Sequence, residues 1–275
     1  MKERQDTAPS ATDIPRILGG QAEKTSDAPV SPLPDERLDE VNDRLSLLQK
    51  KKGMTFGTDA LLLAAFVHAR PESRGLELGA GSGIVSLLCA ARGKFAHIEC
   101  VEIQHEYADL CRRNVRLNGL GNIIEVTEAD LRCEKDYAPK EVDAVFANPP
   151  YMTCDSGFAA SDPGRHAARH EVWGGLADFC RAAAHKVRYG GAFFTVWRPD
   201  RMTDLLCHLR AAGLEPKKMV LVFPAEGAAP SLLLTEARRG GAPGGLVTRP
   251  FYMADKSGNT TPEMTAILTG GRMPL

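Results

Sequence analysis

The sequence predicts an α/β fold with one seven-strand sheet, mostly parallel, that ends in a C-terminal antiparallel hairpin. Three observations support this prediction. Short apolar runs alternate with helical stretches from residue 75 onward, a glycine-rich turn follows the first run, and a single turn separates the last two runs. Strands that alternate with helices of about 10–15 residues are typical of βαβ units, in which the strands are parallel.

The seven predicted strands are short apolar runs at 75–79, 96–103, 123–127, 142–148, 191–197, 218–223 and 231–237. The predicted helices lie at 60–67, 83–92, 105–118, 170–188 and 200–212. A short apolar strand or turn at 45–48 precedes them, and Asp59 is placed to cap the first helix. Only the turn from Pro224 to Pro230 separates the last two strands, so we expect them to pair antiparallel.

The N-terminal segment differs in composition from the rest of the chain. A chain of 275 residues is long enough for one α/β domain with short additions. Residues 1–34 contain five prolines and no aromatic residue, so they bury too little apolar surface to offset the entropy lost on ordering. We therefore predict a disordered tail over 1–34 and a folded domain over 35–275.

Composition restricts the location and the partners. The chain has 34 basic and 35 acidic residues, so nucleic-acid binding would need a local basic patch. No apolar run approaches the ~20 residues that span a bilayer, and the N-terminus lacks the apolar region of a secretory signal. The seven cysteines form no CxxC pair, which argues against a zinc site or a disulfide framework. We expect a cytoplasmic protein with no membrane, metal or obligate protein partner.

A glycine-rich turn follows the first predicted strand. Gly79, Gly81 and Gly83 allow a tight turn and bring the backbone close to a ligand at the N-terminus of the next helix. Their G-x-G-x-G spacing differs from the G-x-G-x-x-G of dinucleotide sites. Glu77, two residues before the first glycine, suits the ammonium group of a methionyl moiety.

Carboxylates mark the ends of the next two predicted strands. Glu102 comes about 20 residues after the glycines, where it could accept hydrogen bonds from both hydroxyls of a ribose, and Ile103 would flank an adenine ring. Asp130, followed by Leu131, could accept from the adenine amino group. Ligands bind at the carboxyl ends of parallel strands, so we expect these residues to line one nucleoside pocket.

The fourth predicted strand runs into Asn148-Pro149-Pro150-Tyr151. Two adjacent prolines hold the backbone extended. The Asn148 amide and the Pro149 carbonyl can both accept from one nitrogen that carries two hydrogens, which positions a planar amine without a strong base. Tyr151 would stack on the flat substrate, as side chains do in enzymes that bind an extruded base. The segment therefore predicts methylation of a planar amino nitrogen.

Together these motifs resemble the class I S-adenosylmethionine-dependent amino-methyltransferases with an Asn-Pro-Pro-Tyr motif, and more narrowly the family of tRNA adenine-N6 methyltransferases that modify the adenosine beside the anticodon of a valine tRNA. The narrower resemblance depends on flanking stretches at 35–39, 56–63, 168–171, 234–241 and 258–263. It implies a Rossmann-like class I methyltransferase fold, S-adenosylmethionine as cofactor and tRNA as partner.

The resemblance also implies roles for further residues. Thr58 and Asp59 would close over the methionine end of the cofactor beside Glu77, while Glu102 would hold the ribose and Asp130 the adenine. Asn148 would contact the cofactor as well as the substrate. The basic residues that could follow RNA phosphates are Lys50, Lys51, Lys52, Arg165, Arg169, Arg198, Arg201, Arg238 and Arg239.

Two alternative functions fit part of the pattern. The same four-residue segment serves enzymes that methylate N5 of a glutamine side chain in translation release factors, but those enzymes carry a helical recognition domain ahead of the fold. A non-catalytic RNA-binding protein could also keep this fold, although such proteins usually lose the glycines or the asparagine. We therefore expect S-adenosylmethionine-dependent N6-methylation of adenine in RNA, most simply in tRNA next to the anticodon.

Overall fold

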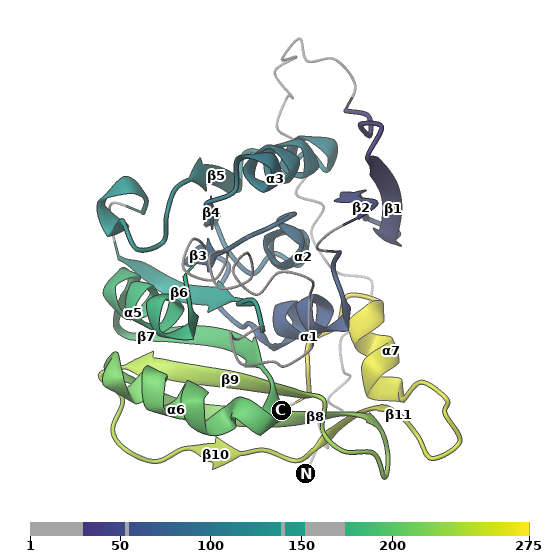
Figure 1. Cartoon of the computed structure of the whole chain (residues 1–275). Helices are drawn as coiled ribbons and strands as arrows, with labels where there is room; N and C mark the ends of the chain where they lie inside the picture. Colours follow the sequence, from purple (N-terminus) through teal and green to yellow (C-terminus); the bar gives the residue numbers. More distant parts are fainter. Residues whose placement is uncertain (1–29, 53–54, 139–140, 152–173, 275) are drawn as a thin grey trace, which may run out of the picture.

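The computed structural model describes residues 30–52, 55–138, 141–151 and 174–274. Its main sheet contains β3 (Arg74–Leu78), β4 (His97–Glu102), β5 (Ile124–Glu128), β6 (Val142–Ala147), β7 (Val187–Trp197), β8 (Leu214–Ala225), β9 (Leu232–Arg239), β10 (Leu246–Val247) and β11 (Phe251–Ala254). Among the described residues the sheet is nine-stranded, in the order β10-β8-β9-β7-β6-β3-β4-β5, with β11 paired to β8 (Figure 1).

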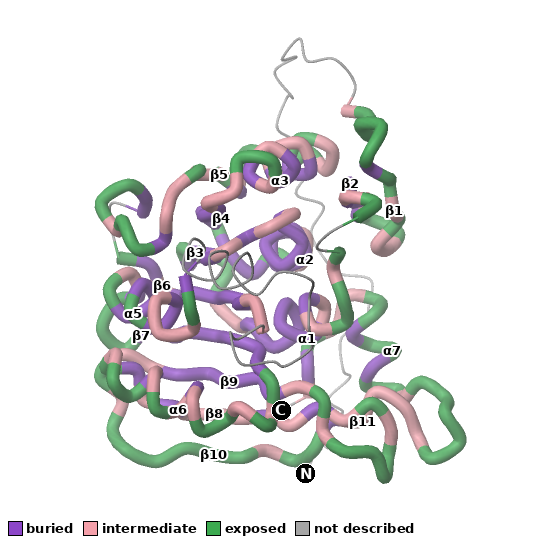
Figure 2. Tube along the Cα trace, in the orientation of Figure 1, coloured by how far each residue is buried: buried purple, intermediate pink, exposed green. Residues whose placement is uncertain are grey.

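Helices cover both faces of this sheet. They are α1 (Thr58–Phe66), α2 (Ile84–Ala91), α3 (His105–Leu117), α5 (Leu176–Lys186), α6 (Met202–Ala211) and α7 (Pro262–Leu268), with 3-10 turns η1 (Glu134–Asp136) and η2 (Pro199–Arg201). Helices α1, α2, α3 and α7 contribute to one apolar core, and α5 and α6 to a second. Strands β3, β4, β6 and β9 are largely buried, whereas β5, β8, β10 and β11 are more exposed (Figure 2). No helix in the described part of the chain is long and apolar enough to cross a membrane.

The predicted fold class is confirmed. Strands β3 to β9 occur in the predicted order, and the five strands β3 to β7 are joined by parallel pairings. The last two predicted strands, β8 and β9, form the expected antiparallel pair. Because β9 also pairs antiparallel with β7, it runs against its neighbours on both sides.

Several elements differ from the prediction. The short strand or turn predicted at 45–48 is strand β2 (Leu45–Lys50), which forms a hairpin with a further strand, β1 (Glu36–Asn42). Strand β1 was not predicted, because its residues are mostly polar and only Glu36 among them is buried. Helix α5 begins at Leu176, so the described residues 174–175 are not helical, and the expected end of that helix belongs to β7. Strands β10 and β11 extend the sheet beyond the seven predicted strands by pairing with β8.

The two ends of helix α1 differ in how they are capped. The prediction that Asp59 caps it was wrong, because the N-cap is Gly57 and Asp59 lies within the first turn. At the other end, the buried Lys94 ammonium donates hydrogen bonds to the carbonyls of Ala64 (2.6 Å) and Val67. These bonds satisfy carbonyl groups that a helix C-terminus leaves without intrahelical partners. Burial also lowers the pKa of Lys94 to about 8.

The topology defines two edges of the sheet. Strands β3, β4, β5, β6 and β7 all end at one edge, which we call the C-terminal edge, and begin at the opposite, N-terminal edge. The glycine turn, Glu102 and Asn148 follow or end three of these strands, so the fold gathers them at the C-terminal edge.

Candidate active site

The glycine turn after β3 needs glycine for its backbone. Gly79, Gly81 and Gly83 have φ angles of 67°, 55° and 81°, in the left-handed region that other residues rarely adopt. A Cβ at Gly83 would lie 2.5 Å from the Cys111 sulfur, and one at Gly79 would lie 3.1 Å from the Phe179 ring. A Cβ at Gly81 would meet no described atom within 4 Å. The turn therefore packs against protein at its two ends and borders open space at its centre.

Glu102 ends β4 beside this turn. Its carboxylate accepts hydrogen bonds from the backbone N–H groups of Gly81 and Gln104, both at 2.9 Å, and the residue is 3% exposed. Burial raises the pKa of Glu102, although the two backbone donors oppose that shift. The carboxylate is thus held rigidly, with acceptor capacity that the two backbone bonds leave free.

A pocket opens where β3, β4 and β6 end. Its lining residues are Gly79, Val101, Glu102, Ile103, Gln104, Ala129, Leu131, Asn148, Pro150 and Phe179. The structure therefore brings together six of the predicted site residues, namely Gly79, Glu102, Ile103, Leu131, Asn148 and Pro150. Apolar walls with one fixed carboxylate are what a nucleoside requires, since a flat base and a ribose with two hydroxyls must both be accommodated.

Phe179 is a pocket residue that the sequence analysis missed. It projects from α5, which follows the Asn148 segment by more than 20 residues in the chain and reaches the pocket only through the packing of that helix on β6 and β7. Its ring lies against the Gly79 turn and is buried. A phenylalanine in an amphipathic helix carries no signal that separates a pocket wall from ordinary core.

Asn148 belongs to a hydrogen-bonded network of three side chains. Its Nδ2 donates to Asp59 Oδ2 at 2.8 Å, and its Oδ1 accepts from the Tyr151 hydroxyl at 2.8 Å. The same hydroxyl lies 3.1 Å from Asp59 Oδ2. The network joins the first turn of α1 to the segment after β6, two parts of the chain that are 89 residues apart.

Tyr151 packs against the end of β7. Its ring meets the Trp197 indole edge-on, with ring centroids 5.7 Å apart and an interplanar angle of 60°. Trp197 is 3% exposed, and its Nε1 finds no hydrogen-bond partner among the described residues. Burial and the nearby Asp59 carboxylate raise the pKa of Tyr151, so its hydroxyl keeps its proton. The expected stacking of Tyr151 on a substrate base stays a prediction.

Glu77 lies beneath the glycine turn and does not line the pocket. One carboxylate oxygen accepts from the Ser86 backbone N–H at 3.0 Å and from the Ser86 hydroxyl. The residue is 3% exposed, and burial raises its pKa to about 8. These contacts tie β3 to α2, while a role for Glu77 toward a methionyl ammonium group stays a prediction.

Two further predicted cofactor residues, Asp130 and Thr58, do not line the pocket. Asp130 follows β5, and its carboxylate accepts from the Arg132 backbone N–H at 2.9 Å and from the Arg132 guanidinium at 2.6 Å, which lowers the pKa of Asp130. Thr58 is the exposed first residue of α1. Contacts of Asp130 with adenine and of Thr58 with methionine stay predictions.

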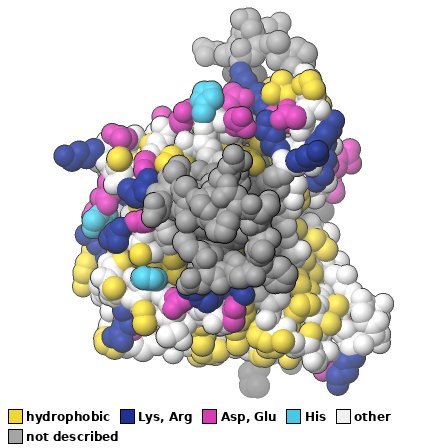
Figure 3. Space-filling view, in the orientation of Figure 1, with side chains coloured by type: hydrophobic (Ala, Val, Ile, Leu, Met, Phe, Trp, Pro, Cys, Tyr) yellow, Lys and Arg dark blue, Asp and Glu magenta, His cyan; other side chains and the backbone are white. Residues whose placement is uncertain are grey.

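The predicted RNA-contacting residues separate into groups. Arg165, Arg169 and the 168–171 stretch lie outside the described residues. Lys50 pairs with Asp35 at 2.9 Å and its side chain is only 12% exposed, whereas Lys51 and Lys52 are exposed. Basic and acidic side chains are interspersed over the face shown in Figure 3.

The four remaining arginines lie at opposite edges of the sheet. Arg198 and Arg201 follow β7 at the C-terminal edge and pair with Asp200 and Asp204 respectively. Arg238 and Arg239 end β9, which runs the other way, and pair with Glu236 and Glu141. Arg238 is in register with Ala192 of β7, five residues before Trp197, a separation of about 17 Å along the strand.

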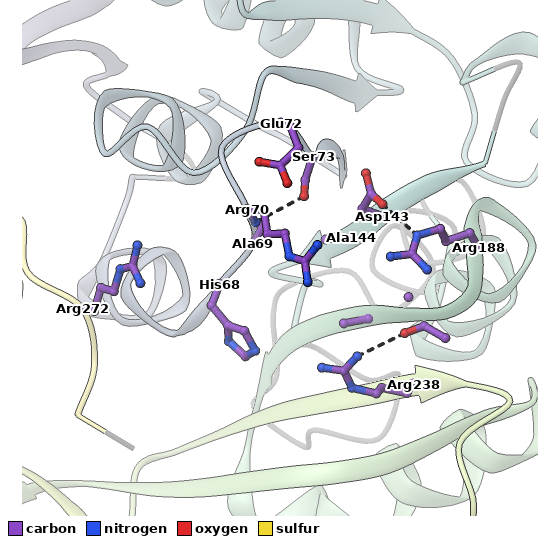
Figure 4. Close-up of a pocket in the computed structure, with 13 residues that line it drawn as sticks. His68, Ala69, Arg70, Glu72, Ser73, Asp143, Ala144, Arg188, Arg238 and Arg272 are labelled. Carbon is purple, nitrogen blue, oxygen red and sulfur yellow. Dashed lines mark hydrogen bonds and ion pairs between the residues drawn. The ribbon is translucent and has the colours of Figure 1, made fainter. Parts of the chain in front are cut away.

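A second hollow, which we call the N-terminal groove, lies at that opposite edge (Figure 4). It has a volume of about 640 Å³, and its charged lining residues are Arg70, Glu72, Asp143, Arg188, Arg238 and Arg272. Arg188 pairs with Asp143 at 2.7 Å, and Arg238 donates to the Gly190 carbonyl at 3.1 Å. The groove contains none of the glycine turn, Glu102 or Asn148. Among the described residues, no group of three or more His, Cys, Asp or Glu side chains could hold a metal ion.

Comparison with known proteins places this chain among methyl-transferring proteins. The sequence model of the family described as "Methyltransferase small domain" matches residues 51–206. A tRNA1(Val) (adenine(37)-N6)-methyltransferase of Shewanella amazonensis is 32% identical over 188 residues, which are 68% of this chain and 79% of that protein. A protein of the same name from Bacteroides fragilis is 29% identical over 67% of this chain and 77% of its own length.

A solved structure supports the fold. The crystal structure of a predicted O-methyltransferase from Agrobacterium tumefaciens matches with a TM-score of 0.64 and covers 78% of this chain and 98% of its own. At 24% sequence identity this similarity concerns the fold alone.

Proposed function

Since the chain belongs to the methyltransferase small domain family, we propose that it methylates N6 of an adenine in tRNA, next to the anticodon. It is an S-adenosylmethionine-dependent methyltransferase, and the resemblance drawn from its motifs is confirmed by relatives at about 30% identity. The names of those relatives support the adenine and the tRNA. The observation that carries the proposal is that Asn148 and the buried Glu102 carboxylate line one mainly apolar pocket.

The pocket residues fit the cofactor. Gly81 borders open space where a ligand can approach the backbone, and Glu102 has acceptor capacity for ribose hydroxyls. Ile103, Leu131 and Phe179 offer apolar surface for a flat base. S-Adenosylmethionine supplies an electrophilic methyl group on its sulfonium sulfur.

The residues after β6 would hold the methyl acceptor. Asn148 Oδ1 and the Pro149 carbonyl accept hydrogen bonds from the two hydrogens of the adenine amino group, which fixes its nitrogen toward the methyl group. The nitrogen would gain the methyl group as the carbon–sulfur bond of the sulfonium breaks and leaves a neutral thioether, and it would release one of its hydrogens as a proton to water, so the site needs no strong base. Orientation and polar contacts would supply the rate enhancement.

Nucleoside analysis tests this function. The purified protein is incubated with labelled S-adenosylmethionine and total unmodified tRNA, and the digested RNA is examined by mass spectrometry. We expect N6-methyladenosine with the wild-type protein and none with Asn148→Ala. A parallel incubation contains a translation release factor in place of tRNA, and label on its glutamine, with none in RNA, would instead establish the glutamine reaction. RNA binding without any transfer would indicate the non-catalytic alternative.

A further inference from the structure

Asp59 makes contacts that the predicted cofactor role does not explain. Its carboxylate faces both residues at the ends of the Asn148–Tyr151 segment, at 2.8 Å from Asn148 Nδ2 and 3.1 Å from the Tyr151 hydroxyl. We propose that Asp59 is a positioning residue, which orients the Asn148 amide so that the amide oxygen can accept a hydrogen bond from the substrate amine. This inference rests on the proposed function, in which Asn148 Oδ1 accepts from that amine.

The orientation follows from what each group can donate. An ionised carboxylate only accepts hydrogen bonds, whereas an asparagine amide donates through nitrogen and accepts through oxygen. With Asp59 on one side, the amide is stable only with Nδ2 toward the carboxylate, a charge-assisted bond. The oxygen of Asn148 is then left free of the carboxylate and faces the Tyr151 hydroxyl, at 2.8 Å. Without Asp59, the amide could turn over and present N–H groups to an amine that also carries N–H groups.

Tyr151 completes the arrangement, because its single hydroxyl proton has two acceptors. Asn148 Oδ1 lies 2.8 Å from the hydroxyl and Asp59 Oδ2 lies 3.1 Å away. When a substrate amine donates to Asn148 Oδ1, the hydroxyl can turn its proton to Asp59 and keep a partner. Burial and the Asp59 charge raise the pKa of Tyr151, so the proton remains available for this exchange. Asp59 therefore accepts the hydrogen bond from Asn148 Nδ2 throughout, and it can also accept the Tyr151 proton once a substrate amine occupies Asn148 Oδ1.

The position of the Asp59 carboxylate is fixed locally. Its second oxygen accepts from the Ala60 backbone N–H at 2.9 Å in the first turn of α1. A Cβ at Gly57 would lie only 2.8 Å from that same oxygen, so the absence of a side chain at Gly57 leaves the room that the carboxylate occupies. Gly57 has an extended backbone (φ −119°), so an alanine there would disturb the carboxylate and not the chain direction.

The positioning role and the cofactor role predict different kinetics. A residue that holds the methionine end of the cofactor would, when changed, weaken cofactor binding. A residue that orients Asn148 would leave cofactor binding intact and lower the rate at saturating cofactor and RNA. The two roles can therefore be separated by measuring the Kd for S-adenosylmethionine alone and kcat in the presence of tRNA.

Three variants carry the test. Asp59→Asn preserves shape but can present either N–H or C=O to Asn148, and we expect kcat to fall about 10- to 100-fold, the loss typical of one hydrogen bond to a charged group. Gly57→Ala keeps Asp59 charged while displacing its carboxylate, so kcat should fall by less. Glu263→Gln is the matched control, since Glu263 is also an acidic residue in the first turn of a helix and is exposed. It should change neither quantity.

The outcomes separate this inference from the proposed function. If the wild-type protein forms no N6-methyladenosine, the proposed function fails. If the wild-type protein is active and Asp59→Asn keeps its kcat, or loses only cofactor affinity, the positioning role is overturned. Thermal unfolding of each variant shows whether it is folded. If Asp59→Asn does not fold, Gly57→Ala, which keeps the Asp59 carboxylate, tests the positioning role in its place. An unchanged kcat for Gly57→Ala would then overturn the role.

Discussion

The two edges of the sheet differ in the kind of side chain they gather. The N-terminal groove is lined by arginines, of which Arg188 and Arg238 are paired with acidic residues. The pocket at the C-terminal edge is mainly apolar, and its polar lining residues are Glu102, Gln104 and Asn148. The groove is the more highly charged hollow, yet the groups suited to methyl transfer lie at the other edge. The direction of the strands therefore predicts the site better than the number of charged lining residues, because the carboxyl ends of the parallel strands meet at the C-terminal edge.

The largest effect should follow removal of the Asn148 side chain. Asn148→Ala deletes the proposed acceptor for the substrate amine, and a loss of about 100- to 1000-fold in kcat is expected by analogy with the removal of one preorganised polar group at a reacting centre. The variant should still bind S-adenosylmethionine. Steady-state rates on tRNA and calorimetric titration of the cofactor measure the two quantities. Equal rates for the variant and the wild type would remove Asn148 from the mechanism.

Glu102 should matter for affinity more than for rate. Glu102→Ala removes the proposed ribose acceptor and a partner of the Gly81 backbone, so the Kd for S-adenosylmethionine should rise about 10- to 100-fold, as expected for hydrogen bonds to a charged group. Calorimetry gives this value directly, and kcat at saturating cofactor should change little. An unaltered Kd would show that the cofactor lies elsewhere.

Substitution of one arginine at each edge tests on which side of the sheet the RNA binds. Arg198, at the C-terminal edge, is predicted to contact RNA phosphate, so Arg198→Ala should raise KM for tRNA and reduce the slope of log K against log salt by about 1. Arg70 lines the N-terminal groove, and Arg70→Ala should leave both quantities unchanged. The reverse result would place the RNA on the N-terminal side.

A separate prediction concerns the pH dependence of stability at Glu77, away from the pocket lining. Its pKa in the folded protein, about 8, lies above the ordinary value of 4.5, so its contribution to stability is fully present below pH 4.5 and is lost as pH rises through about 8. Glu77→Gln keeps an acceptor for Ser86 without a titrating group. The melting temperature of the wild type relative to this variant should therefore fall between these pH values. A constant difference would mean that Glu77 does not titrate in this range.

Some residues of the site could be predicted from the sequence, and others could not. Gly79, Glu102 and Asn148 were predictable because each follows or ends a recognisable strand, and the α/β topology brings such positions together. Phe179 and the network around Asp59 were not, because both depend on how helices pack onto the sheet. Strand β1 pairs with β2 alone among the described strands and buries little apolar surface, so its sequence can be polar and shows no apolar run from which a strand could be predicted.

The central claim, that the cofactor binds at the C-terminal edge, is tested most directly by ultraviolet cross-linking of labelled S-adenosylmethionine followed by peptide mapping. The account predicts label in peptides that contain residues 79–83, 101–104 or 148–151, and loss of that label with excess unlabelled cofactor. Competable label in peptides that contain residues 68–73 or 188–192, which line the N-terminal groove, would contradict it.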